Sequence, residues 1–210
     1  AYISARRWEW SLVRTSLLYL WLFGVGELIV LFAFRDRLVL QHPIAWLYLV
    51  TLIVNVLAAI VGIMDSLRIR PANTPNGAIL TSAQKSPTAA FVVFVGFLGA
   101  YGLIAQIGDA GTNGGIFPEL MSLFTLRSFG VFYLALALAV IPFFWKIGRK
   151  TVLHHSYATY GLIVFITIAA LVYLPLFDFS ARPGGLLYFA AYLGVGIPLA
   201  FVFRKHGTGS

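Results

Sequence analysis

The sequence contains no cysteine among its 210 residues, and only 10% of the residues are charged. The absence of cysteine excludes disulfide bonds, thiolate metal sites and thiol chemistry. Soluble domains typically contain about 25% charged residues. A chain in which 60% of the residues are apolar also cannot hide that much apolar surface from water at this size. The scarcity of charge therefore excludes an ordinary soluble domain and indicates lipid as the main solvent.

Long continuous apolar runs take the place of the missing charges. A chain that crosses a membrane must satisfy its backbone hydrogen bonds internally, which leaves α-helices or a closed barrel. Barrel strands are alternating segments of about 10 residues, whereas the runs here are continuous and close to the ~20 residues of a spanning helix. We therefore predict one all-α transmembrane domain over 1–210 with about six transmembrane helices. The predicted spans are 12–34, 44–64, 89–107, 128–147, 157–177 and 185–204.

The net charge of +8 is distributed unevenly along the predicted topology. If both termini lie on one side of the membrane, eleven of the 15 Lys and Arg residues lie on that side. Basic residues collect in cytoplasmic loops, so the pattern predicts a multi-pass protein of the cell membrane with both termini cytoplasmic. The same rule explains the positive charge without a nucleic-acid partner. Membrane lipids are the expected surroundings.

A shift of the chain by 113 residues places several rare residues on identical ones. The matches are Arg14 with Arg127, His42 with His155, and Asp65 with Asp178. If they reflect a duplication, the repeat halves are 12–107 and 125–204. Each half then holds three spans, and an odd count gives the halves opposite orientations, an arrangement common in secondary transporters. The alternative is that helix ends often carry such residues and the matches are coincidental.

Glu27 is the one acidic residue placed well inside a predicted span. An ionisable side chain within the membrane is costly and is a functional candidate by default. The polar residues expected near its depth on other helices are Thr51, Asn55, Tyr101 and Thr167. One hypothesis is a proton or cation site at Glu27 on a transport path. The other is a structural Glu27 that joins two helices through a hydrogen bond to Asn55 or Thr51.

Other residues favour structural interpretations. Tyr and Trp near the span ends, such as Trp46 and Tyr48, are typical of an interfacial aromatic belt. The topology places His42 on one side of the membrane and the pair at 154–155 on the other, which disfavours bis-histidine haem ligation or a metal site. The sequence identifies no cofactor. Three prolines interrupt the last three predicted spans and are expected to kink them: Pro142, Pro175 and Pro198.

Three hypotheses for function follow. The first is a small transporter or channel for an ion or small solute, with its site near the midplane at Glu27. The second is a non-catalytic integral subunit of a larger respiratory or photosynthetic complex, and a homo-oligomer is a further form of assembly. The third is a lipid-modifying enzyme with Asp65 or Asp178 at its centre. Because neither aspartate has a convincing constellation of partners, an enzyme is the least favoured.

Overall fold

The structure is a computed structural model that describes residues 10–37, 40–69, 78–79, 81–105, 116–117, 121–141 and 148–206. Within these residues the chain is helical, apart from turns and one isolated β-bridge between Ile79 and Gly148. The long helices are α2 (Trp10–Ala33), α3 (Pro43–Ile69), α4 (Ser82–Ile104), α5 (Leu123–Val140), α6 (Arg149–Val172) and α7 (Gly184–His206). Two short 3-10 helices, η1 (Arg35–Arg37) and η3 (Leu174–Leu176), follow α2 and α6. The all-α prediction is confirmed.

Three of the helices contain segments that are long and apolar enough to cross a membrane. These are Val13–Ala33 in α2, Pro43–Arg68 in α3 and Leu123–Val140 in α5. Shorter apolar segments lie in the other three helices, at Thr88–Ile104, Tyr160–Val172 and Gly184–Gly194. The helical architecture and the three long apolar helices are those of a helical membrane protein.

Each predicted span overlaps one of these helices, but the ends differ. Helix α4 begins at Ser82 instead of 89, and α5 begins at Leu123 instead of 128, because a helix can continue past its apolar run. Helix α6 ends at Val172, and Pro175 lies in η3. The predicted kink at Pro175 is therefore wrong: proline lacks a backbone donor, and here the α-helix has ended before it. Helix α7 continues across Pro198, and Pro142 lies outside the described residues.

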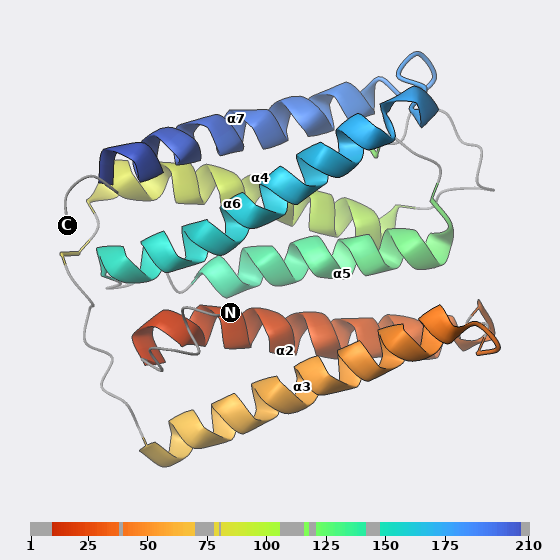
Figure 1. The fold of residues 1–210 in the computed structure, drawn as a ribbon, viewed down its shortest axis with the longest axis horizontal. Helices are drawn as coiled ribbons and strands as arrows, with labels where there is room; N and C mark the ends of the chain where they lie inside the picture. The colour runs from red at the N-terminus through yellow and green to blue at the C-terminus, as the bar shows by residue number, and fades with distance from the viewer. Residues whose placement is uncertain are drawn as a thin grey trace. The chain divides into compact units, whose positions relative to one another are not determined.

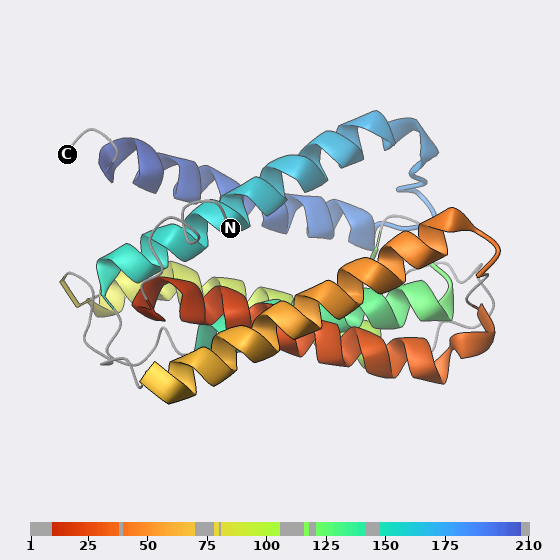
Figure 2. The ribbon, with the colours of Figure 1, turned by 60° about the horizontal axis from the view of Figure 1, so that its bottom comes forward.

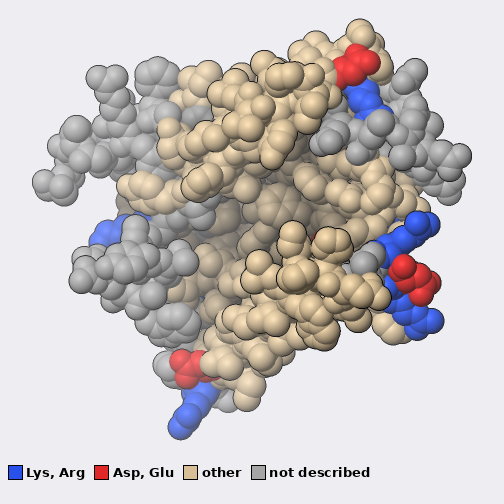
Figure 3. Space-filling view, turned by 45° about the vertical axis from the view of Figure 1, so that its right-hand side comes forward, with Lys and Arg blue, Asp and Glu red and all other residues tan. Residues whose placement is uncertain are grey.

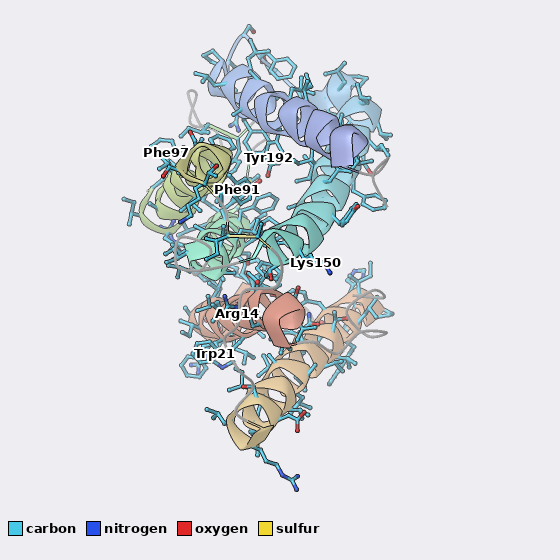
Figure 4. The ribbon with its side chains drawn as sticks, turned by 90° about the vertical axis from the view of Figure 1, so that its left-hand side faces the viewer. Arg14, Trp21, Phe91, Phe97, Lys150 and Tyr192 are labelled. Atoms are coloured by element: carbon cyan, nitrogen blue, oxygen red, sulfur yellow. The ribbon has the colours of Figure 1, made fainter. Side chains whose placement is uncertain are left out.

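The chain divides into two compact units. The first consists of Ala1–Ala105 and Leu123–Val152, and the second of Gln106–Ser122 and Leu153–Ser210. In the first unit α2 lies between α3 and α5, and α4 packs on the other side of α5 (Figures 1 and 4). In the second unit α7 runs antiparallel to α6 (Figure 2). These units differ from the predicted repeat halves, because the first unit includes α5.

Glycines bring α4 and α5 into backbone contact. A Cβ atom built on Gly102 would lie 2.5 Å from the Cα atom of Gly130, and one on Gly99 would lie 2.7 Å from the backbone nitrogen of Leu134. Real side chains do not approach this closely, so the two positions require glycine. Small residues that allow close backbone approach are the usual means of helix association in lipid. This interface fixes α5, which carries part of the site described below.

Helix α3 packs against α2, within the first unit, along a narrow stripe. Its buried apolar residues Ala45, Leu52 and Ala59 lie seven residues apart and face α2. The rest of the helix exposes large apolar side chains: Ile44, Leu47, Val50, Ile53, Val54, Leu57, Val61 and Met64. In Figure 3 the charged side chains form small separate groups with uncharged surface between them. Such a face is expected where a helix meets lipid.

Candidate functional site

Glu27 lies in the interior of the first unit, with 1% of its surface exposed. The glycines beside it let the neighbouring helices close on α2. A Cβ atom on Gly24 would lie 2.5 Å from Cγ2 of Val56 in α3, and one on Gly26 would clash with Val131 in α5. The sequence Gly24-Val25-Gly26-Glu27 therefore places a carboxyl group where three helices meet.

Two hydroxyl groups hold one oxygen of this carboxyl group. Tyr48 in α3 donates a hydrogen bond from Oη to Oε2 of Glu27, with a length of 2.5 Å. Ser128 in α5 donates a second hydrogen bond from Oγ to the same oxygen, with a length of 3.0 Å. The other oxygen, Oε1, is buried and has no hydrogen-bond partner among the described residues. The two carboxyl oxygens are thus chemically distinct.

The three residues meet because the helices are antiparallel. Glu27 precedes the end of α2 at Ala33, whereas Tyr48 and Ser128 follow the starts of α3 and α5. Each residue lies about 8–9 Å from its helix end at ~1.5 Å rise per residue. The cluster therefore lies about halfway between the middle of α2 and the end of the helix at Ala33. Its level is set by where the three helices begin and end.

An aromatic layer lies deeper in the unit. Tyr19 stacks on Phe23 with ring centroids 5.7 Å apart. Phe132 of α5 packs edge-on against both rings, at 5.9 Å from Phe23 and 6.2 Å from Tyr19. On α2 this layer separates Glu27 from the beginning of the helix. A path from Glu27 along α2 towards its start would have to pass these rings.

Arg127 joins α5 to the end of α4. Its Nη1 atom donates hydrogen bonds to the carbonyl oxygens of Gly102, at 2.7 Å, and Ala105, at 2.9 Å. The last carbonyl groups of a helix have no partner within the helix, and a cation is also favoured there by the helix dipole. Arg127 therefore caps α4, while the next residue, Ser128, binds Glu27. One turn of α5 thus fixes both contacts.

The structure places the predicted site residues in different surroundings. Thr51 is exposed and donates to the carbonyl oxygen of Leu47 in its own helix, at 2.7 Å. Asn55 is half-buried, and the described residues show no hydrogen bond between it and Glu27. The partners predicted for a structural Glu27 are therefore corrected to Tyr48 and Ser128. Tyr101 is half-buried in α4. Thr167 lies in the second unit and donates to the carbonyl oxygen of Ile163, at 2.7 Å.

The sequence contained signals for Tyr48 and Ser128, the two partners of Glu27 that were not predicted. Tyr48 precedes Thr51 by three positions and Asn55 by seven, so all three lie on one side of α3. Its aromatic side chain near a helix end favoured an interfacial interpretation. Ser128 was expected at the first position of its span, but α5 begins at Leu123. Because the helix starts five residues earlier than predicted, Ser128 lies within the helix at the level of Glu27 and not at its end.

The remaining titratable candidates form no catalytic arrangement among the described residues. Asp178 is exposed, and its Oδ1 accepts hydrogen bonds from the hydroxyl and N–H of Ser180 and the N–H of Ala181. These hydrogen bonds, that from the Ser180 hydroxyl most of all, lower the pKa of Asp178, as expected in a tight turn. Burial lowers the pKa of His155 to about 4. Within the described residues no group of three or more His, Asp or Glu side chains could hold a metal ion.

Comparison of the chain with models of protein families, with curated proteins and with solved structures finds no match. The geometry around Glu27 is therefore the basis for the functional argument.

Proposed function

We propose that this protein is a small transporter or channel of the cell membrane that binds an ion or small solute at Glu27. The observation that carries the proposal is the asymmetry of the buried carboxyl group. Oε2 of Glu27 accepts two hydrogen bonds, whereas Oε1 has no partner among the described residues. The lone pairs of Oε1 are therefore not used by any hydrogen bond among the described residues, and we propose that this oxygen is the one that binds the ligand.

Energetics support a functional role over a purely structural one. A carboxyl group inside a membrane-spanning helix is costly. A buried polar atom without a hydrogen-bond partner costs about 1–3 kcal/mol more. A side chain that only joined helices would gain nothing from the second oxygen, because an amide or a hydroxyl could accept the same hydrogen bonds. The presence of a carboxyl group at this position is explained if Oε1 binds a ligand.

The proposal includes a topology of six spans. Helices α4, α6 and α7 contain 23, 24 and 23 residues, and ~20 residues cross a ~30 Å hydrocarbon core. With six spans, both termini share one side, and eleven of the 15 Lys and Arg residues lie on that side. Positive charge favours the cytoplasm, so we propose that both termini are cytoplasmic.

The inverted repeat remains part of the proposal. The 113-residue shift relates Arg14 of α2 to Arg127 of α5. The correspondence is weaker for the following helices, since α3 begins at Pro43 and α6 at Arg149. Transporters with inverted repeats bind their substrates between halves. Glu27 and Ser128 lie on the two related helices.

The large apolar face of α3 favours a second candidate function. Only 17% of the residues in the most apolar segment of α3 are buried. The exposed apolar surface is also what we expect of a non-catalytic subunit that packs against other membrane chains or a second copy of itself. Gentle extraction from the native membrane, followed by analysis of what purifies with the protein, distinguishes a transporter from a subunit. Stoichiometric partner chains or a bound pigment would support the subunit function, whereas a protein that purifies alone would support the transporter.

The direct test of the transporter is a flux assay in liposomes that contain the purified full chain. Wild-type protein and the Glu27→Gln variant are compared for proton, Na⁺ and K⁺ flux over a range of pH. We expect Glu27→Gln to lower flux by about tenfold or more, a loss of ~1.4 kcal/mol or more in transition-state stabilisation. Asp36→Asn is the matched control, because the side chain of Asp36 is 94% exposed. Equal flux in wild type and Glu27→Gln at every pH would contradict the proposed role.

A further inference from the structure

We propose that the ligand of the Glu27 site is a proton, and that it binds to Oε1. This inference rests on the proposed site but not on transport itself. Binding converts the carboxylate to a carboxylic acid, forms one O–H bond on Oε1 and requires no other reactant. Tyr48 and Ser128 are then positioning residues that hold Oε2 and leave Oε1 as the basic atom.

The hydrogen bonds divide the roles of the two oxygens. Each hydroxyl group has a single proton, and those of Tyr48 and Ser128 both point to Oε2. A carbonyl oxygen can accept two hydrogen bonds, so Oε2 keeps both partners when the carboxyl group is neutral. Oε1 is the oxygen with free lone pairs. The geometry thus accommodates protonation without the loss of any observed hydrogen bond.

The surroundings do not suit a metal cation. Hard divalent cations take about six to eight oxygen ligands, whereas the described contacts of Glu27 supply only two hydroxyl groups, both committed as donors to Oε2. Among the described residues Glu27 belongs to no group of three or more His, Asp or Glu side chains that could hold a metal ion. The backbone at Gly24 and Gly26 is also in contact with Val56 and Val131. A hydrated ion would need these helices to separate, but a proton would not.

The charged and titratable groups around Glu27 are few. On α2, Tyr19 lies eight residues before Glu27 in the aromatic layer, and on α3 Tyr48 donates its hydrogen bond. On α5 the contacting residue is Ser128, which does not titrate, and the neighbouring Arg127 is directed to the carbonyl groups of α4. No ion pair to Glu27 occurs in the described part of the chain. A carboxylate here would be a buried charge without an ionic partner, which is costly, and protonation removes that charge.

The test is infrared spectroscopy of the full chain in lipid vesicles, because a protonated carboxyl group has a C=O stretching band that a carboxylate lacks. Spectra are recorded from about pH 3 to about pH 9, because an unperturbed glutamate side chain has a pKa of about 4.3. We expect the wild-type spectra to contain a carboxylic acid band whose amplitude changes with pH. This band should be missing from the spectra of Glu27→Gln. Replacement of Na⁺ and K⁺ by choline should leave its amplitude unchanged. Ser128→Ala and Tyr48→Phe should shift the band, because each removes a hydrogen bond to the carbonyl oxygen.

Two results would overturn the inference. One is the absence of any Glu27-dependent carboxylic acid band across the pH range. The other is a band whose amplitude falls when Na⁺ or K⁺ is added, which would show that a metal ion competes for the same oxygen. If Glu27→Gln does not fold, the shifts in Ser128→Ala and Tyr48→Phe assign the band instead. A titrating band without Glu27-dependent flux would uphold the proton site and refute transport, so the two proposals fail separately.

Discussion

Helices α3 and α5 are both apolar enough to cross a membrane, yet they are packed very differently. Half of the residues in the apolar segment of α5 are buried (50%), against 17% for α3, although α3 is the more hydrophobic of the two. The buried fraction therefore does not follow hydropathy, and the more buried helix is the one with small residues at its contacts. The buried set of α5 includes Gly130, Ala135, Ala137 and Ala139. In lipid no hydrophobic force drives one apolar helix onto another, so close packing of small residues decides which helices associate.

The comparison extends to function. Helix α5 contributes Ser128 to the Glu27 site and Arg127 to the end of α4. Helix α3 contributes Tyr48 from its narrow buried stripe and exposes the rest of its surface. The more buried helix therefore carries more of the polar contacts. This difference predicts an order of sensitivity to substitution.

The largest effect is expected at the α4–α5 backbone contact. In Gly102→Leu the new Cβ would lie 2.5 Å from the Cα of Gly130, and the helices would have to separate. We expect a loss of about 3 kcal/mol or more in the free energy of unfolding, measured by detergent-induced unfolding. Gly161→Leu in α6 is the control, since a Cβ there meets nothing within 4 Å among the described residues. Similar losses in both variants would refute the special role of the contact.

The next effect is expected at Arg127. Arg127→Leu removes the donor to the carbonyl oxygens of Gly102 and Ala105, and hydrogen bonds from charged groups contribute about 1.5–3 kcal/mol. We expect a loss of that size by the same unfolding assay. Arg35→Leu should change stability by about 0.5 kcal/mol or less, because the Arg35 side chain is 73% exposed. If Arg127→Leu were as stable as Arg35→Leu, the capping role would be wrong.

A smaller effect is expected within α3, where two adjacent residues provide an internal comparison. Leu52 is 3% exposed and faces α2, whereas Ile53 is 50% exposed. Leu52→Ala should lower the free energy of unfolding by about 1–3 kcal/mol, towards the low end of values for buried leucine, because lipid replaces part of the lost contact. Ile53→Ala should cost less than about 0.5 kcal/mol. The reverse order would show that another face of α3 is the packed one.

The smallest effect is expected at the hydroxyl groups of the Glu27 site. Tyr48→Phe and Ser128→Ala each remove one hydrogen bond to Oε2 while the other remains. A single hydrogen bond contributes about 0.5–1.5 kcal/mol net, so each variant should fold and lose roughly that amount in the unfolding assay. Thr51→Val is the control on α3, because Thr51 is bonded to its own helix. A loss in Thr51→Val equal to that in Tyr48→Phe would contradict the assignment of partners.

The sequence alone predicted the fold class and the approximate positions of the six long helices that the structure describes. Apolar runs of sufficient length leave few structures other than a helix in lipid, so the overlap of all six predicted spans with helices follows from composition. The ends were less accurate because polar residues such as Ser82 and Thr125 can continue a helix beyond its apolar run. Glu27 was also identifiable from the sequence, since a carboxyl group within a span is rare.

Only the tertiary structure decided which residues contact Glu27. Hydropathy reports that a residue prefers lipid to water, but in lipid every apolar helix face is nearly equivalent, and the pattern does not specify a neighbour. The selection of Tyr48 and Ser128 over Thr51 and Asn55 depends on where α3 and α5 begin and on glycines that let the backbones meet. The sequence thus determined a helical membrane protein with a carboxyl group in its interior. The close packing of α2, α3 and α5 determined which oxygen of that group accepts two hydrogen bonds and which has no partner among the described residues.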